Sequence, residues 1–310
     1  MLMLVVFMLR KNRLRIGFVR IDNRKYERII DKVIKIFRKI FIKIKVETIE
    51  NGNIILIPKY GKYNKFVLKI LTRQLKESIN KYEIDELAIE EKLNFFQQEI
   101  DNIQILNGRY LMKNSVLKIF QYIFNNKPNM SLENVYIFVN ECSKNNIYII
   151  DLLLSEFKTV NIITENLRYY RRLEEKYFNK GILLTVSNNK RKSAKMAKFI
   201  IDIDFEKEKL EKYNINMEAI IINLTNEKIF FKSRFKGVIV NDFEVKVDDD
   251  SKDFIDEFYG SINKKIYLES KIKNSLESFK NVDEIYKQYN AKITDLIGIR
   301  GVIQKCEFLV

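Results

Sequence analysis

The sequence predicts an α/β protein of about two domains: an N-terminal mixed α/β domain, a domain built on a mostly parallel sheet, and C-terminal helices. Its 310 residues are enough for two domains of ordinary size. Hydrophobic residues make up 46% of the chain, with only nine Gly and two Pro. After residue 133, apolar strands alternate with helices, as in a parallel sheet covered on both faces. The expected ranges are 1–106 for the N-terminal domain, 107–130 for a connecting helix, 131–245 for the parallel-sheet domain and 246–310 for a C-terminal helical segment.

The N-terminal domain is predicted from short β-rich runs and two amphipathic helices. Asn51-Gly52, between two such runs, is typical of a hairpin. Asp22 or Asn23 stands where it can cap the helix that follows the first strand. The elements expected here are strands at Arg15–Ile21, Lys45–Ile49, Asn53–Pro58 and Ile84–Ile89, and helices at Tyr26–Phe41 and Phe66–Lys81.

The helix at Tyr26–Phe41 carries its apolar residues on one broad face. We expect that face, Phe37 and Phe41 included, to be buried against the sheet. The alternative is a basic amphipathic helix that lies on an anionic membrane or partner. Residues 1–50 hold 14 basic and five acidic residues, so +9 of the net charge of +15 lies here. We interpret this excess first as a consequence of the Lys-rich composition.

The second half of the chain has the most regular pattern. A connecting helix is expected at Asn107–Phe124, ended by Lys127–Asn129. Five apolar strands then follow within about ninety residues, which is the spacing of a Rossmann-like domain. The expected strands are Val135–Val139, Val160–Thr164, Ile182–Val186, Phe199–Ile203 and Ala219–Leu224, with helices at Lys144–Phe157, Asn166–Phe178 and Lys190–Ala197.

The C-terminal segment begins with an acidic run. We interpret Asp248–Ser251 as a solvated turn at a helix N-terminus, because adjacent carboxylates rarely converge on one cation and the spacing is not that of an EF-hand. A helix or two follow to about Asn290, and Ile293–Ile303 forms a last short strand or coil.

Composition excludes several kinds of chemistry. The chain has no His, which removes His bases and His metal ligands. Cys142 and Cys306 are the only cysteines, so we expect neither a disulfide framework nor a metal site, and we expect a reducing, cytoplasmic compartment. The apolar run Met1–Leu9 is far shorter than the roughly 20 residues that span a bilayer, so no transmembrane segment is predicted.

Three stretches carry a family resemblance: Val160–Gly181, with its polar turn and Arg- and Glu-rich helix closed by Gly; Ala197–Asp204; and Ala219–Leu224. Together they resemble the dinucleotide-binding domain of the shikimate dehydrogenase and glutamyl-tRNA reductase group. The resemblance covers about ninety residues and implies a Rossmann-like fold with an NAD or NADP site at the ends of its strands.

The sequence departs from that group at the phosphate loop. The resemblance implies G-x-G-x-x-G after the first strand, but residues 140–146 read NECSKNN, without a glycine. Side chains there would crowd the pyrophosphate, and Asp202 and Asp204 after the fourth strand also disfavour a phosphate. We interpret Cys142 as structural rather than nucleophilic, because no His is present to act as its base. If a dinucleotide does bind, the candidate residues are Cys142, Ser143, Lys144, Glu165 and Arg168.

Three functions remain open. The first is a non-catalytic binding or regulatory role without cofactor, in a protein that has lost redox catalysis. The second is an NAD(P)-dependent oxidoreductase with an atypical phosphate loop. The third is weak binding of nucleic acid or an anionic surface through the basic N-terminal segment, since no motif for specific nucleic-acid recognition accompanies its charge. The sequence names no partner and leaves an oligomer open.

Overall fold

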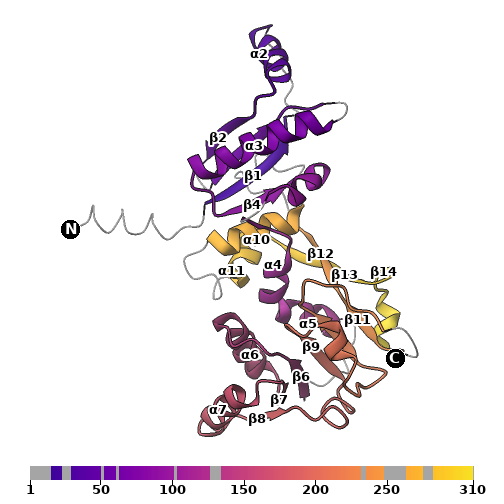
Figure 1. The fold of residues 1–310 in the computed structure, drawn as a ribbon. Helices are drawn as coiled ribbons and strands as arrows, with labels where there is room; N and C mark the ends of the chain where they lie inside the picture. The colour runs from indigo at the N-terminus through magenta and orange to yellow at the C-terminus, as the bar shows by residue number, and fades with distance from the viewer. Residues whose placement is uncertain are drawn as a thin grey trace, which may run out of the picture. The chain divides into compact units, whose positions relative to one another are not determined.

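The computed structural model describes residues 15–22, 29–49, 52–60, 63–100, 103–125, 134–231, 235–247, 263–274 and 282–309 (Figure 1). The chain folds into two compact units. Unit 1 comprises residues 1–108 and 247–290, and unit 2 comprises residues 109–246 and 291–310. The chain therefore passes from one unit to the other three times, after Gly108, Lys246 and Asn290. These units differ from the expected ranges, because the C-terminal segment 246–310 is divided between both.

Unit 1 is built on a five-stranded sheet with the strand order β2-β3-β1-β4-β5. Every neighbouring pair is parallel except β2 and β3, which are antiparallel. The elements of unit 1 are β1 (Ile16–Ile21), α2 (Ile29–Ile40), β2 (Lys45–Ile49), β3 (Gly52–Ile57), α3 (Lys65–Lys81), β4 (Glu86–Ile89), the 3-10 helix η1 (Glu91–Gln98), β5 (Gln104–Ile105), α10 (Lys264–Asn274) and α11 (Val282–Gln288).

The core of unit 1 forms where the central strands pack against α3. Val19 of β1 lies opposite Ile55 of β3 and Ile89 of β4, so three apolar side chains share one level of the sheet. Leu71 and Leu75 of α3 are completely buried in the same cluster. This burial explains why the central strands are almost wholly apolar.

The expected hairpin in unit 1 is present as the antiparallel pair of β2 and β3, in which Ile49 lies opposite Gly52. Gly52 has φ +150°, and a Cβ atom there would lie 2.4 Å from the backbone oxygen of Ile16. The glycine is therefore required by a close approach of β1, in addition to its place in the turn.

Unit 2 contains a six-stranded sheet in which every neighbouring pair is parallel, with the order β11-β10-β9-β6-β7-β8. Counted from its first strand, this is the order 6-5-4-1-2-3 of a Rossmann-like domain. A separate antiparallel sheet follows the order β12-β13-β14. The elements of unit 2 are α4 (Arg109–Asn114), α5 (Val116–Asn125), β6 (Asn134–Phe138), α6 (Lys144–Glu156), β7 (Thr159–Ile163), α7 (Leu167–Phe178), β8 (Leu184–Ser187), β9 (Phe199–Asp202), α8 (Lys207–Leu210), β10 (Ile220–Asn223), β11 (Val238–Val240), β12 (Asp242–Lys246), β13 (Lys292–Gly298), β14 (Gly301–Val302) and the 3-10 helix η2 (Lys305–Leu309).

Two sequence predictions of elements are wrong in detail. The helix expected at Lys190–Ala197 is a series of turns, in which the Asn189 side chain accepts hydrogen bonds from the backbone N–H groups of Arg191 and Lys192. Such side-chain acceptors stabilise a turn in place of a helix. The connecting helix is interrupted at Ser115, which separates α4 from α5. By contrast, the last short strand or coil expected at Ile293–Ile303 is present as β13 and β14.

The expected orientation of the first helix is also wrong. Arg38 is the one buried residue of α2, whereas Phe37 and Phe41 are 53% and 64% exposed. The Arg38 guanidinium donates to the Asp22 carboxylate over 2.5 Å and to the backbone oxygen of Leu56 over 3.2 Å. This buried ion pair turns the polar side of α2 towards the sheet and leaves its apolar face outside.

Several sequence predictions lie outside the described residues. They are Met1–Leu9, the basic residues Arg10, Lys11 and Arg13, the cap Asn23, the turn Glu50–Asn51, the helix stop Lys127–Asn129 and the acidic run Asp248–Ser251. Within the ranges that the structure describes, no helix combines the length and the apolar character needed to cross a bilayer.

Candidate functional site

The carboxyl ends of the six parallel strands of unit 2 form one polar edge. In parallel α/β sheets this edge is where ligands bind. Each of five strands ends in, or is followed within two residues by, a polar side chain: Asn140 after β6, Thr164 after β7, Ser187 in β8, Asp202 in β9 and Asn223 in β10. We therefore take this edge as the candidate site.

The loop between β6 and α6 is held by a carboxylate from another strand. Asp204, two residues after β9, accepts hydrogen bonds from the backbone N–H groups of Asn140 (2.6 Å) and Glu141 (2.7 Å). It accepts a third from the side-chain amide of Asn146 in α6, at 3.0 Å. An internal carboxylate thus occupies backbone donors at the junction where a dinucleotide-binding domain receives pyrophosphate.

The side chain of Asn140 joins this loop to the loop after β7. Its Oδ1 accepts from the backbone N–H of Glu165 at 2.8 Å and from the hydroxyl of Thr164 at 3.3 Å. The amide of Asn166 lies 3.1 Å from the sulfur of Cys142. Hydrogen bonds from their own side chains therefore join the first two strand–helix junctions.

A buried tyrosine also forms a hydrogen bond to this loop. Tyr170 of α7 is fully buried, and its hydroxyl donates to the backbone oxygen of Glu141 at 2.8 Å. The Asn146 amide donates to the same oxygen at 3.0 Å. Burial, with further contributions from Cys142 and Asp204, raises the pKa of Tyr170, so the phenol stays protonated and acts as a donor.

Burial also governs the two aspartates at this edge. It raises the pKa of Asp204, although hydrogen bonds from Glu141 and Asn140 and the charge of Lys113 oppose the rise. The pKa of Asp202 is raised well above its ordinary value, also chiefly by burial, and its Oδ1 accepts from the backbone N–H of Phe205 at 2.9 Å. At both carboxyl groups, burial therefore favours the neutral, protonated form.

The thiol of Cys142 is not activated. It is exposed, and desolvation together with the charges of Asp204 and Glu141 raises its pKa. A nucleophilic cysteine needs the opposite shift. The raised pKa gives no support to a nucleophilic Cys142, and its interpretation as a structural or incidental residue stays a prediction.

The five predicted site residues lie at the first two strand–helix junctions. Ser143 caps α6, its hydroxyl accepting from the backbone N–H of Asn146 at 3.2 Å. Lys144 is exposed in the first turn of that helix, and Arg168 is exposed in α7. The Glu165 carboxylate lies 3.7 Å from the Lys209 ammonium. Their role in binding stays a prediction, since position alone does not test it.

Sequence reasoning missed the residues that determine the shape of the loop. The Asp-x-Asp after β9 was recognised only as unfavourable for a phosphate, and Asn146 and Tyr170 gave no signal because an Asn and a Tyr in a helix have many ordinary roles. The signal that was available is Asp204 itself, a carboxylate placed at the edge where an anion would bind.

A dinucleotide does not fit the residues present. Its pyrophosphate needs backbone N–H groups and a close backbone approach, which glycines normally permit. Here the N–H groups of Asn140 and Glu141 already donate to Asp204, and no glycine lies between residues 139 and 147. Within the described part of the chain, no group of three or more metal-binding side chains is placed to hold a metal ion.

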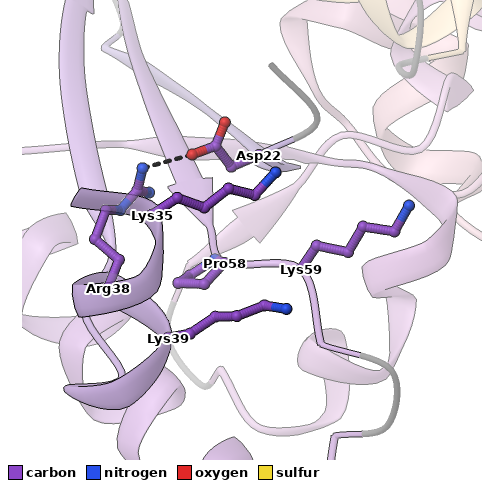
Figure 2. A pocket seen from close by; sticks show the side chains of 6 residues that line it. All are labelled: Asp22, Lys35, Arg38, Lys39, Pro58 and Lys59. Carbon is purple, nitrogen blue, oxygen red and sulfur yellow. Dashed lines mark hydrogen bonds and ion pairs between the residues drawn. The ribbon is translucent and has the colours of Figure 1, made fainter. Parts of the chain in front are cut away.

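A second polar site lies in unit 1, at the carboxyl ends of β1 and β3. A shallow pocket there is lined by Asp22, Lys35, Arg38, Lys39, Pro58 and Lys59. Figure 2 shows Arg38 directed to Asp22, while the lysine side chains extend past Pro58. With its carboxylate matched by Arg38, the pocket has a cationic rim.

No protein-family model and no curated protein matches the sequence. Among solved structures, the chain is similar to L-tryptophan dehydrogenase from Nostoc punctiforme, with TM-score 0.37 and 10% identity over 89% of this chain and 80% of that one. It is also similar to shikimate dehydrogenase from Mycobacterium tuberculosis, with TM-score 0.31 and 7% identity over 89% and 98% of the two chains. Likenesses of this size say nothing about activity, and the class of the fold rests on the strand order of unit 2.

Proposed function

We propose that this chain is a non-catalytic protein whose Rossmann-like unit serves binding or regulation and takes no dinucleotide cofactor. The observation that carries the proposal is the carboxylate of Asp204 on the backbone N–H groups of Asn140 and Glu141. Those donors lie in the loop between β6 and α6, where a Rossmann-like domain holds its pyrophosphate, and the Asp204 carboxyl group stands beside them.

The remaining groups at this edge also favour a non-catalytic role. The pKa of Cys142 is raised, and the chain has no His to act as a general base. Thr164 and Asn140 bond to neighbouring loops, so these side chains hold the edge together. Both cysteines are exposed and free, which suits a reducing compartment, and we propose the cytoplasm.

Calorimetric and thermal-shift titrations of the full chain with NAD, NADP and their reduced forms test the proposal. We expect no saturable binding. A ligand at about 100 times its Kd would stabilise the protein by roughly 2.7 kcal/mol, so a real site would be detected as a raised melting temperature. Micromolar affinity for any of the four would overturn the proposal.

A variant sharpens this test. Asp204→Ala removes the internal carboxylate and frees two backbone donors near the start of α6, so inorganic pyrophosphate should stabilise the variant but not the natural protein. Asp151→Ala, at an exposed site on α6, is the matched control and should behave like the natural protein. Equal responses of the two variants to pyrophosphate would show that Asp204 does not block an anion site.

The second candidate function is an NAD(P)-dependent oxidoreductase. It is supported by the Rossmann order of the strands and by Glu165, which follows β7 where an acidic residue would bond to a ribose hydroxyl. The same titrations decide between the two candidates, because only the oxidoreductase requires the dinucleotide.

A further inference from the structure

Helix α2 presents an apolar face that no described part of unit 1 covers. Its large apolar residues are between 45% and 80% exposed. They lie on one side of the helix at the spacing of successive turns, and they continue into Phe41, whose ring stacks on that of Phe37. The members of this outer face are Ile29, Ile30, Val33, Ile34, Ile36, Phe37, Ile40 and Phe41.

The outward orientation has a structural cause. The side of α2 opposite the outer face is held by the buried pair of Arg38 and Asp22 and by the bond from Arg38 to the backbone oxygen of Leu56. The hydroxyl of Tyr60 adds a bond to the backbone oxygen of Lys39 at 2.8 Å. Turning the outer face inward would break the buried ion pair, so the exposed apolar face is a fixed feature. Contiguous exposed apolar patches of this kind mark interaction sites.

The positive charge on and after α2 indicates which kind of partner the outer face binds. The helix and the three residues that follow it carry Lys32, Lys35, Lys39 and Lys43 against the single acidic residue Asp31. Two copies of this helix packed face to face would bring like charges together, whereas an anionic surface would attract them. The cationic rim of the pocket adds Lys59 on the side of Lys35 and Lys39 (Figure 2).

We propose that α2 is an in-plane membrane-binding helix, and that its partner is a bilayer containing anionic lipids. The outer face enters the boundary between headgroups and acyl chains, and the lysines remain at the level of the lipid phosphates because their long side chains reach back to water. An apolar face combined with lysines is the combination that binds anionic lipid in preference to neutral lipid. The proposal concerns unit 1 and does not depend on the cofactor question in unit 2.

Vesicle cosedimentation of the full chain tests the proposal. One set of vesicles is phosphatidylcholine alone, and the other contains phosphatidylglycerol as well. We expect binding to the second set at low salt, much weaker binding to the first, and a fall at high salt because screening weakens the lysine contribution. No binding to the anionic vesicles, or equal binding to both sets, would overturn the proposal.

Matched variants distinguish binding through α2 from nonspecific adsorption of exposed apolar residues to vesicles. Phe37→Glu with Ile40→Glu places charges on the outer face and should lower the vesicle-bound fraction by about tenfold or more, because the apolar insertion is lost. Phe178→Glu with Leu183→Glu makes the same change at exposed apolar residues of unit 2 and should leave binding unchanged. All four side chains are at least half exposed, so both proteins should fold, which circular dichroism checks. Equal losses in the two variants would contradict a role for α2.

Three further measurements test the lysines and exclude other occupants. Lys32→Gln with Lys39→Gln should weaken binding to anionic vesicles, while Lys158→Gln with Lys195→Gln, at exposed positions of unit 2, should not. Inorganic phosphate at constant ionic strength should not compete, and if it does, the lysines bind a free anion instead of a bilayer. Sedimentation velocity without lipid should show no association that Phe37→Glu abolishes, since that result would identify a second copy of the chain as the occupant.

Discussion

The carboxyl groups that follow strands of the two large sheets have different partners in unit 1 and in unit 2. In unit 1, Asp22 follows β1 and is matched by the guanidinium of Arg38, so the lysines around it give the place a positive character. In unit 2, Asp204 follows β9 and accepts hydrogen bonds from the backbone N–H groups of Asn140 and Glu141, without the charge of a guanidinium in these bonds. The difference teaches that the partner of one carboxylate decides which sign of ligand a strand edge attracts.

The largest expected effect comes from breaking the pair in unit 1. Arg38→Ala leaves the buried carboxylate of Asp22 without its guanidinium and should lower the free energy of unfolding by about 3 kcal/mol. Urea denaturation followed by circular dichroism measures it. The matched control is Arg73→Ala, which removes the exposed pair with Glu77 in α3 and should change stability by less than about 1 kcal/mol. Similar losses in both variants would mean that the Arg38 pair is no stronger than a surface pair.

A smaller effect is expected from the buried carboxyl group in unit 2. Burial raises the pKa of Asp202, so the folded state holds this proton more tightly than the unfolded chain. The resulting stability is fully present below the unfolded pKa of about 4 and is lost as the pH rises through the folded pKa.

The variant Asp202→Asn should therefore reduce the fall in melting temperature with rising pH, because the amide cannot ionise and can still accept from Phe205 through its oxygen. Asp204, whose pKa is also raised, contributes the remaining pH dependence. Glu156→Gln, at an exposed position near the end of α6, serves as the control and should leave the slope unchanged. An unaltered slope in Asp202→Asn would contradict the assignment.

The smallest effect is expected from the hydrogen bond between Tyr170 and the loop after β6. Tyr170→Phe removes the hydroxyl that donates to the backbone oxygen of Glu141, and should cost about 1 kcal/mol, since the Asn146 amide still donates to that oxygen. Tyr169→Phe, at the partly exposed neighbouring residue, should be close to neutral. Chemical denaturation of the two variants side by side measures the difference, and equal stabilities would show that the Tyr170 bond contributes nothing.

Much of the fold follows from local sequence. The apolar runs of β6, β9 and β10 predicted buried strands, and the alternation with helices predicted a parallel sheet, because such strands must be covered on both faces. The turns at Lys190–Ala197 were harder to predict, and for β13 the sequence left open whether the segment is strand or coil. The turns depend on a side-chain acceptor at Asn189, and β13 depends on pairing with β12, which lies far away in the chain.

The outer face of α2 and the loop after β6 were less predictable than the fold. Helical periodicity showed which face of α2 is apolar, but not what it faces, because Arg38 finds its carboxylate 16 residues away, at the end of another element. The missing glycines after β6 predicted an unusual phosphate loop, and this stays a prediction. That Asp204 bonds to this loop depends on the sheet order, which places β9 beside β6.

The three passages of the chain between the units have a consequence for synthesis on the ribosome. Unit 1 lacks α10 and α11 until residues beyond 263 have emerged, and unit 2 lacks β13 until residues beyond 291 have emerged. Unit 1 is therefore completed only after most of unit 2 has been translated, so domain-by-domain folding from the N-terminus is not available to this chain. A nascent chain stalled before residue 247 holds the strands of the five- and six-stranded sheets but lacks α10, α11 and the strands β13 and β14 that pair after β12, which the last sixty or so residues supply.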